Sequence, residues 1–392
     1  MDVKYNSNDA VQVDKQMADI RARGFDGVEL DWYSQFNTSQ DQTAQLIRDN
    51  LDGKCLSPQN CPLEYLLVYD QGAVTRTEGT RAACTGSVSA MQACILADLC
   101  YANATYFGTP GYVKVNPTTH AWATSTNPEV GFFPPSDTSL WNTAVSNLKA
   151  ITANNGWAAS MCPAGEQQAN GGLVFVDKDT TNVASSPYSG GGSWVGTSAW
   201  PNQFLIDGPT GTYHEDLYSS CSSNTSSFCE GSGKKGFDDN IGNFGSNRVI
   251  AQECGQTWVQ TLGKASHFTG SNLELHVPTW NDYDEGSEIE TGIDNCYRIN
   301  APTLVSSTVS WTMSTNDSTY APLSGNGTID HFAVWACDLN DKNCSLAGTT
   351  TPSTLSLNVS SLPSGSYHIW VQMVGVNSIL NRMSPSAVTY TH

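Results

Sequence analysis

The stretch VQVDKQMADIRARGFDGVELDWY, residues 11–33, decides the fold. Its first part spaces apolar residues as a helix does and stops at Gly24, and residues 25–33 have the composition of a short strand. The same alternation of helix and strand recurs over roughly the first 300 residues, which indicates a parallel sheet with outer helices. Since the (β/α)8 barrel is the commonest closed form of such a sheet, we expect that fold.

Further strands and helices follow the same pattern. Strands are predicted at 63–70, 111–116, 171–179, 192–200, 235–244 and 273–282, and helices at 87–104 and 139–155. Apolar runs repeatedly finish on an acid, namely Asp31, Asp70, Asp177, Asp238 with Asp239, and Asp282. Carboxylates at the ends of many parallel strands would meet at one rim, where barrel enzymes have their active sites. Aspartate also starts loops and caps helices, and that alternative is preferred for any one of these positions taken alone.

The texture of the sequence changes near Ala301. From there, alternating strand-like runs without helical spacing are separated by turn residues. We therefore expect a barrel domain over residues 1–299 and a small antiparallel β-sandwich of the immunoglobulin or fibronectin kind over 300–392. This second domain could bind glycan or pack against the barrel, and the structural role is preferred.

The charge balance restricts the partners of the chain. Among 392 residues, 18 Lys and Arg face 37 Asp and Glu, which gives a formal charge of −19. Nucleic acid and anionic lipid would be repelled, so a neutral substrate is expected. No apolar run approaches the length of a membrane span. Few charged residues together with many Gly, Ser, Thr, Asn and aromatic residues are typical of secreted polysaccharide enzymes.

Twelve cysteines indicate an oxidising compartment. Short loops could be closed by Cys55 with Cys61, Cys221 with Cys229, and Cys337 with Cys344. Three more bridges could form among Cys84, Cys94, Cys100, Cys162, Cys254 and Cys296, although spacing does not give their connectivity. A zinc site is the less favoured alternative because no C-x-x-C or H-x-x-x-H pair is present. We expect a secreted protein in which Met1 begins a mature or trimmed form.

The tract LELHVPTWNDYDEGSEIE, residues 273–290, contains the residues best suited to catalysis. Cleavage of a glycosidic bond needs one protonated acid at the leaving oxygen and one carboxylate that assists attack. Asp282 and Glu285 supply such a pair, and crowding of like charges would raise one pKa. Glu285, the longer side chain, is the predicted general acid, and Asp282 is the predicted base or attacking carboxylate. We expect Glu288 and Glu290 to bind backbone amides or solvent.

Aromatic residues near predicted strand ends could hold sugar rings. Trp280 and Tyr283 could form a stacking wall, although a single Trp is more often a packing residue. His214 is a weaker candidate for substrate contact. The predicted substrate-binding set is Asp31, Trp32, Tyr33, Asp70, Asp177, Trp200, His214, Asp238, Asp239, Trp280 and Tyr283.

Other catalytic templates are missing from the sequence. It has no G-x-S-x-G elbow, no Walker A motif, no G-x-G-x-x-G opening a helix and no H-E-x-x-H, and it has no D-x-D-x-D-G calcium loop. We expect no cofactor and no metal.

Three tracts together resemble the related glycoside hydrolase families 71 and 99: residues 24–33, 235–239 and 279–290. In both families a tryptophan-containing strand end carries two acids separated by two residues and followed closely by Gly or Ser, a pattern that falls here on Asp282 and Glu285 with Gly286 next. Family 99 has Glu at the first acid, whereas this chain has Asp, as in family 71. The resemblance spans residues 2 to about 298.

The resemblance implies a secreted, endo-acting glycoside hydrolase on a barrel, with α-1,3-glucan as the first substrate and α-mannan as the second. A non-catalytic glycan-binding or cell-surface protein on the same scaffold is the alternative, and transglycosylation at the same site is a third possibility. In each case the expected partner is a polysaccharide, and we expect a monomer.

Overall fold

The computed structural model describes residues 7–57, 60–116, 127–133, 139–168, 171–177, 194–198, 215, 218–219, 222, 228–243, 247, 249–269, 273–321 and 327–392. The chain forms two compact units. The first comprises Met1–Asn202, Tyr213–Gly231 and Ser266–His276, and the second comprises Gln203–Thr212, Ser232–Ala265 and Val277–His392. The second unit therefore includes segments that precede residue 300, where the sequence predicts the domain boundary.

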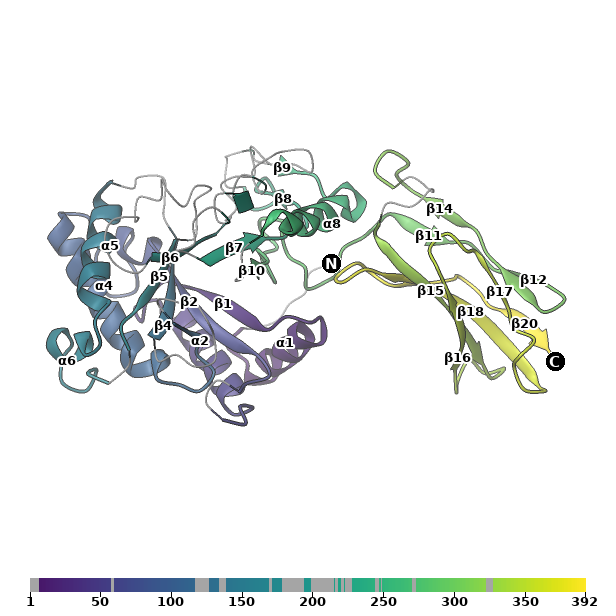
Figure 1. Cartoon of the computed structure of the whole chain (residues 1–392), viewed down its shortest axis with the longest axis horizontal. Coiled ribbons are helices and arrows are strands. Elements are labelled where there is room, and N and C mark those ends of the chain that lie inside the picture. Colours follow the sequence, from purple (N-terminus) through teal and green to yellow (C-terminus); the bar gives the residue numbers. More distant parts are fainter. Residues whose placement is uncertain are drawn as a thin grey trace. The chain divides into compact units, whose positions relative to one another are not determined.

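A mainly parallel sheet forms the centre of the first unit (Figure 1). Adjacent strands run in the order β1 (Gly27–Trp32), β2 (Glu64–Asp70), β4 (Asn127–Phe133), β5 (Val174–Asp177), β6 (Trp194–Ser198), β7 (Phe228–Ser232) and β10 (Leu273–His276). Each pair from β1 to β7 is parallel, and the short β3 (Lys114–Val115) pairs antiparallel with β4. The α/β fold predicted from the sequence is confirmed, although β4 was not foreseen.

The closed barrel stays a prediction, because β1 and β10 are the two ends of this strand order. The side chains of the two end strands nevertheless meet. His276 on β10 lies with its Nε2 atom 3.5 Å from Oε2 of Glu29 on β1, and both side chains are largely buried. The sheet therefore curves enough to bring its first and last strands within contact distance.

The helices of the first unit begin where polar caps stand in the sequence. They are α1 (Ala10–Ala22), α2 (Thr38–Asp52), α3 (Gly72–Thr75), α4 (Val88–Ala102), a π-helix (Asn103–Phe107), α5 (Ser139–Thr152) and α6 (Trp157–Met161). The side chains of Asp9, Asn37 and Ser87 accept hydrogen bonds from backbone amides in the first turns of α1, α2 and α4. Each cap satisfies an amide that has no partner within its helix.

Aromatic side chains fill the space between this sheet and its helices. The rings of Tyr69 and Trp141 stack with centroids 6.0 Å apart, and Phe132 lies against both. Trp32 packs on Tyr69 from the neighbouring strand. Because β2 and α5 both contribute, burial of these rings fixes the helix on the sheet.

Antiparallel strands form most of the second unit, as the sequence predicts for its C-terminal part. One sheet has the order β16 (Ser345–Thr350), β15 (Ile329–Cys337), β18 (Ser366–Gly375) and β19 (Arg382–Met383), with β20 (Val388–Thr391) also on β18. The order β12 (Thr303–Val305), β13 (Thr308–Ser310) and β17 (Ser356–Asn358) forms another, and β11 (Tyr297–Ile299) pairs with β14 (Met313–Thr315). Residues of these strands, among them Val309, Phe332 and Val371, share one core with Trp311, which follows β13.

The predicted strand at 235–244 is wrong in extent and in pairing. Only β8 (Phe237–Asp238) forms there, and it pairs antiparallel with β9 (Val249–Ile250) instead of joining the parallel sheet. The short 3-10 helix Glu253–Gly255, α8 (Gln256–Gly263) and a 3-10 turn Lys264–His267 follow. Two residues are too short a strand to carry the burial pattern on which the prediction depended.

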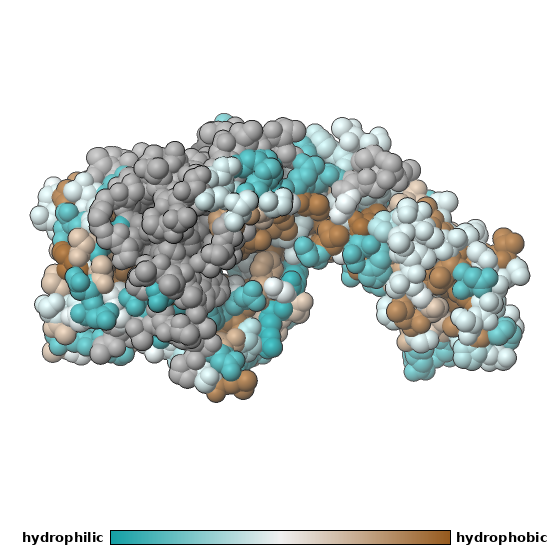
Figure 2. All heavy atoms as spheres, in the orientation of Figure 1, coloured by the Kyte–Doolittle hydropathy of each residue, from teal (hydrophilic) through white to brown (hydrophobic). Residues whose placement is uncertain are grey.

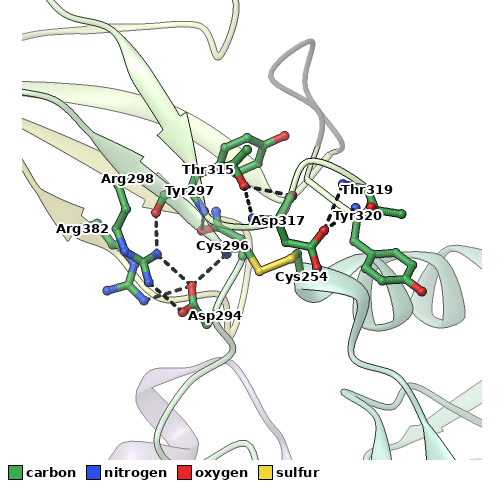
Figure 3. The surroundings of a disulfide bond; sticks show 11 residues. Cys254, Asp294, Cys296, Tyr297, Arg298, Thr315, Asp317, Thr319, Tyr320 and Arg382 are labelled. Carbon is green, nitrogen blue, oxygen red and sulfur yellow. Dashed lines mark hydrogen bonds and ion pairs between the residues drawn. A yellow bond between two sulfur atoms is a disulfide. The ribbon is translucent and has the colours of Figure 1, made fainter.

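Five disulfides lie in the described part of the chain. Cys55–Cys61 and Cys337–Cys344 confirm two predicted short loops, and the six cysteines left open form Cys84–Cys94, Cys100–Cys162 and Cys254–Cys296. The predicted Cys221–Cys229 pair lies outside the described side chains. Cys254–Cys296 joins the residues before α8 to the start of β11 (Figure 3), which gives one physical reason why these earlier segments belong to the second unit.

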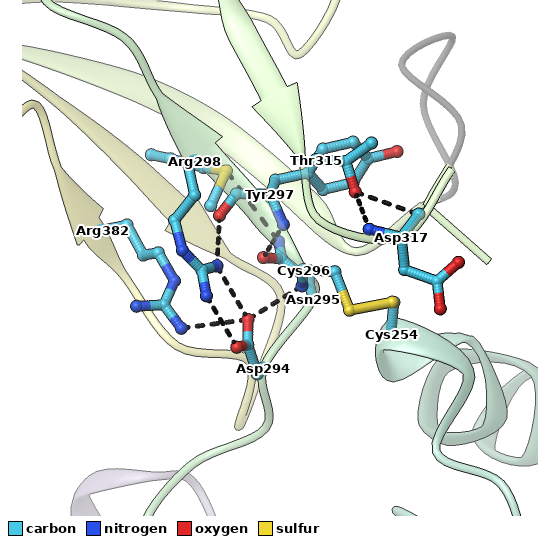
Figure 4. A network of polar contacts seen from close by, with 10 residues as sticks. Cys254, Asp294, Asn295, Cys296, Tyr297, Arg298, Thr315, Asp317 and Arg382 are labelled. Carbon is cyan, nitrogen blue, oxygen red and sulfur yellow. Dashed lines mark hydrogen bonds and ion pairs between the residues drawn. A yellow bond between two sulfur atoms is a disulfide. The ribbon is translucent and has the colours of Figure 1, made fainter. Parts of the chain in front are cut away.

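An ion-pair network stands beside this disulfide (Figure 4). The carboxylate of Asp294 contacts Arg298 and Arg382, each at 3.0 Å, and accepts the backbone amide of Cys296 at 2.8 Å. Burial alone would raise the pKa of Asp294, but the hydrogen bonds from Arg298, Cys296 and Arg382 outweigh it and lower that pKa. The network joins β11 to β19 across the polypeptide segment that enters the C-terminal strands.

No helix among the described residues combines the length and the apolar character needed to cross a membrane.

Candidate active site

The two predicted catalytic acids lie in one turn. The carboxylate of Asp282 accepts a 3.0 Å hydrogen bond from the backbone amide of Glu285, and the amide of Asp282 donates to the hydroxyl of Thr279 at 3.1 Å. Gly286, whose φ is +59°, closes the turn with an amide bond of 3.3 Å to the carbonyl of Tyr283. Asp282 thus holds the loop that carries Glu285.

Further hydrogen bonds join the residues before this turn to the residues after it. The hydroxyls of Thr279 and Ser287 lie 2.8 Å apart, and the backbone amide of Glu290 donates to the carbonyl of Trp280 at 2.9 Å. These bonds close residues 279–290 into a compact loop after β10. Sequence reasoning missed Thr279 and Ser287, because small hydroxyl residues in a loop give no distinctive signal.

Two of the tracts singled out in the sequence meet here. The amide of Asp238 donates a 2.7 Å hydrogen bond to the carbonyl of Glu285, and a side chain at Gly286 would touch the Cβ atom of Asp238 at 3.8 Å. The carboxylate of Asp238 accepts the amide and the side-chain nitrogen of Asn240 at 3.0 and 2.8 Å. The tracts at 235–239 and 279–290 are therefore neighbours in space within the second unit.

Two further acids of the tract, Glu288 and Glu290, bond to side chains, whereas backbone amides or solvent were the predicted partners. Glu288 accepts the ammonium group of Lys235 at 2.6 Å, and both side chains are nearly buried. Glu290 accepts the phenol of Tyr283 at 2.8 Å, which fixes the ring of this predicted sugar-stacking residue. Lys235 was inside a quoted tract, but its role could not be foreseen because its partner is remote in sequence.

Burial and neighbouring charges in the turn raise the pKa of Asp282. Burial is the largest cause that raises the pKa of this carboxyl, and the neighbouring charges of Asp284 and Glu288 add to it. The backbone amides of Glu285 and Asp284 act in the opposite direction but do not cancel the shift. Crowding of like charges thus contributes to the rise, although burial is the larger cause, and the rise falls on Asp282, the predicted base, whereas the sequence argument attached a raised pKa to the general acid. A carboxylate with a raised pKa is a stronger base.

Three predicted residues meet in the first unit at the ends of β1 and β2. Burial, then the charges of Asp31 and Asp70, raise the pKa of the Tyr33 phenol, which also bonds to Asp70. Asp70 accepts the amide of Gly72 at 2.5 Å, and its pKa is raised chiefly by burial. Asp31 is exposed, so this cluster of polar groups has one carboxylate open to solvent.

Two of the predicted substrate contacts are wrong in this structure. Trp32 is 1% exposed, and its indole N–H donates to buried Asp41 at 3.0 Å, so its ring offers no face to a sugar. Asp239 has no exposed surface and cannot reach a ligand from solvent. Asp41 was missed: it also accepts the phenols of Tyr101 and Tyr106, each at 2.6 Å, and organises the core behind β1.

Other predicted residues cannot be placed. Trp200 and His214 lie outside the described residues, and only the backbone of Asp177 is described, at the end of β5. Asp31, Tyr33 and Asp70 belong to the first unit, whereas Asp238, Trp280, Asp282, Tyr283 and Glu285 belong to the second. Their convergence at one rim stays a prediction.

No family model matches the sequence, and no curated protein matches it. Similar solved structures include the family GH99 endo-alpha-mannosidase from Bacteroides thetaiotaomicron in complex with bis-tris-propane, at 13% identity and a TM-score of 0.49, covering 74% of this chain and 75% of that one. A glycoside hydrolase-like protein shares 10% identity at a TM-score of 0.49 and covers 73% of this chain and 80% of that one. Similarity at these values does not establish a common activity.

Proposed function

We propose that this chain is an endo-acting glycoside hydrolase of the kind that its sequence resemblance to families 71 and 99 implies. The observation that carries the proposal is the single turn that holds Asp282 and Glu285, with the amide of one bonded to the carboxylate of the other at 3.0 Å. Glycoside hydrolysis requires a pair of carboxyl groups, and this loop carries two. Trp280 and Tyr283, both partly exposed, flank them.

Glu285 and Asp282 have different roles in this proposal. Glu285 donates a proton to the leaving glycosidic oxygen as the bond to the anomeric carbon breaks. Asp282, whose pKa is raised mainly by burial, removes a proton from the attacking hydroxyl group or water. One oxygen of Asp282 accepts the backbone amide of Glu285, so the same carboxylate that acts as the base also holds the loop that carries Glu285.

The proposed substrate is a neutral α-linked polysaccharide, α-1,3-glucan before α-mannan. The chain charge of −19 argues against anionic polymers, and the ranking follows family 71, which resembles this chain in having Asp as its first acid. The five described disulfides fit an extracellular protein, and secretion belongs to the proposal.

Hydrolysis of a panel of α-glucans and α-mannans by the wild type and by Glu285→Gln tests the proposal. Wild-type protein should release oligosaccharides from the interior of the chains, and Glu285→Gln should lower kcat at least 100-fold. Asp284→Asn, which changes an exposed acid of the same turn, is the matched control and should keep kcat near the wild-type value at the pH optimum. Unchanged turnover in Glu285→Gln would refute the assigned role. The anomeric form of the first product reports whether configuration is retained or inverted.

A specific observation favours the non-catalytic alternative. The carboxylates of Asp70, Asp238 and Asp282 all accept backbone amides two or three residues further on, which is the ordinary behaviour of aspartate at the start of a loop. A glycan-binding protein would show binding to the same panel without product release in the wild type.

A further inference from the structure

The outward face of the sheet formed by β16, β15, β18 and β19 has two tryptophans side by side. Trp335 on β15 and Trp370 on β18 are direct partners in the antiparallel register. Their neighbours along each strand, Val334, Ala336, Ile369 and Val371, point into the core. Since successive residues of a strand alternate between faces, both indoles lie on the face opposite the core.

The exposure of these two indoles sets them apart. Five other tryptophans of the described chain are 3% exposed or less, namely Trp32, Trp141, Trp157, Trp258 and Trp311. Trp335 and Trp370 are only half-buried, as is Trp280 in the candidate active site. Figure 2 shows brown, apolar residues among polar ones over the C-terminal strands, and on its colour scale tryptophan is pale and not brown. A single partly exposed aromatic residue needs no explanation, but two side by side form a patch of the kind that marks an interaction site.

Residues paired with Trp335 and with Gln372, which lies two positions after Trp370 on β18, extend this face into a strip. Leu346 on β16 pairs with Trp335 and is 52% exposed, and Met383 on β19 pairs with Gln372 and is 47% exposed. These two rows contain no charged side chain in a chain whose formal charge is −19, and the one carboxylate that borders them, Asp341, is paired with His368. A neutral partner is therefore favoured over an ionic one.

Hydrogen bonds hold both indoles in fixed orientations. The Nε1 atom of Trp335 donates to Oε1 of Gln372 at 3.0 Å, and Nε1 of Trp370 donates to Oδ1 of Asp341 at 2.7 Å. The Nδ1 atom of His368 lies 2.9 Å from the same oxygen. Amide, carboxylate and imidazole groups thus border the aromatic surface, and each can bond to a hydroxyl group.

A disulfide closes the loop that holds Asp341 beside the indole of Trp370. Cys337 at the end of β15 is bonded to Cys344, which closes the loop that contains Asp341. Within that loop the carboxylate of Asp338 accepts the amides of Asn340 and Lys342, each at 2.9 Å. The loop therefore has little freedom, and the position of Asp341 does not depend on a ligand.

We propose that this face, built on Trp335, Trp370, Gln372, His368 and Asp341, is a binding surface for a neutral polysaccharide, separate from the candidate active site. The C–H faces of pyranose rings pack on the indoles, and the ring hydroxyls bond to the amide, the imidazole and the carboxylate. Rigid aromatic anchors bordered by polar groups suit a ligand that is apolar on its faces and polar at its edges. Recognition by stacking does not require hydrolysis.

Binding of the protein to insoluble α-1,3-glucan and to α-mannan tests the proposed binding surface. The choice of these two polymers rests on the proposed function. The full chain with Glu285→Gln is used throughout so that bound polymer is not consumed. Trp335→Ala/Trp370→Ala should weaken binding about 100-fold, and Trp335→Phe/Trp370→Phe should restore most of it. Val305→Ser, at an exposed apolar residue on β12, is the matched control and should bind as its parent does.

A second variant guards against misfolding of the alanine pair. Leu346→Arg changes an exposed residue and places a guanidinium where it can cover the adjacent Trp335, so binding should fall about tenfold with an unchanged thermal midpoint. The inference is overturned if the parent binds neither polymer, if both variants bind as the parent does, or if the substitutions abolish self-association of the chain instead of polymer binding. Loss of binding in the tryptophan variants upholds it whether or not the wild type hydrolyses either polymer.

Discussion

The backbone amide of Asp238 donates a 2.7 Å hydrogen bond to the carbonyl oxygen of Glu285. These residues lie 47 positions apart in the sequence (285 − 238): Asp238 ends β8, and Glu285 lies in the turn after β10. The bond connects the loop of β8 to the turn that carries both candidate acids. Changes in either loop should therefore affect the same chemistry.

Asp282→Asn separates the structural role of this residue from its chemical role. The Asn side-chain oxygen still accepts the Glu285 amide, so the thermal midpoint should stay near that of the wild type, while kcat falls about 100-fold or more because an amide is not a base. Asp282→Ala should lose activity and also about 0.5–2 kcal/mol of unfolding free energy, since the amide loses its acceptor. Equal thermal midpoints for the two variants would contradict the turn's dependence on this bond.

The pH dependence of kcat/KM reports on Asp282. Its raised pKa places the acidic limb of the profile above the usual 3.8 of an aspartate, because the base works only when ionised. Asp284 is one cause of the rise, so Asp284→Asn should move that limb to lower pH and leave the maximum rate nearly unchanged. A limb that stays in place in Asp284→Asn would show that another group controls it.

Gly286→Ala tests the turn from its other end. The φ of +59° disfavours a side chain, and the added methyl would lie 2.8 Å from Cδ1 of Ile241 and 3.8 Å from Cβ of Asp238. We expect a loss of about 1–2 kcal/mol in unfolding free energy together with a lower kcat. Gly263→Ala, at the end of α8 in open space, is the control and should change neither quantity appreciably. If both variants behave alike, the turn is not strained by a side chain.

Asp98 makes the stability of the chain depend on pH. Burial raises its pKa to about 6, against the opposing effects of Arg81 and Tyr69. The folded state therefore binds this proton more tightly than the unfolded state, and stability should fall as pH rises from 3.8 to about 6. Urea denaturation across this range should show a shallower decline in Asp98→Asn. Asp49→Asn, at a side chain 64% exposed, should keep the wild-type slope.

The Cys254–Cys296 disulfide should contribute more stability than Cys337–Cys344. Their sequence separations are 42 and 7 residues, and the loop-entropy relation gives about 4 and about 2.5 kcal/mol. Paired Cys→Ala substitutions followed by denaturant titration measure each contribution. A larger loss of unfolding free energy on removal of Cys337–Cys344 than on removal of Cys254–Cys296 would show that native-state contacts, and not loop closure, determine these contributions.

The sequence alone determined the elements whose signals are local. Helical spacing that stops at Gly24, the apolar run that became β2 and the alternation that became β15 and β18 each depend on neighbouring residues. Short cysteine spacings likewise predicted the Cys55–Cys61 and Cys337–Cys344 bonds. The acid pair in one turn was also readable, because Asp282 and Glu285 are three residues apart.

Tertiary structure decided which polar and aromatic residues face water. Trp32 ends an apolar run as a substrate-stacking residue would, yet Asp41 on α2 accepts its N–H and holds it in the core. Lys235 has its ion-pair partner at Glu288, and Trp335 and Trp370 became neighbours only through strand pairing. Local pattern fixes the identity of an element, whereas burial and hydrogen-bond partners come from contacts between residues far apart in sequence, which spacing does not encode.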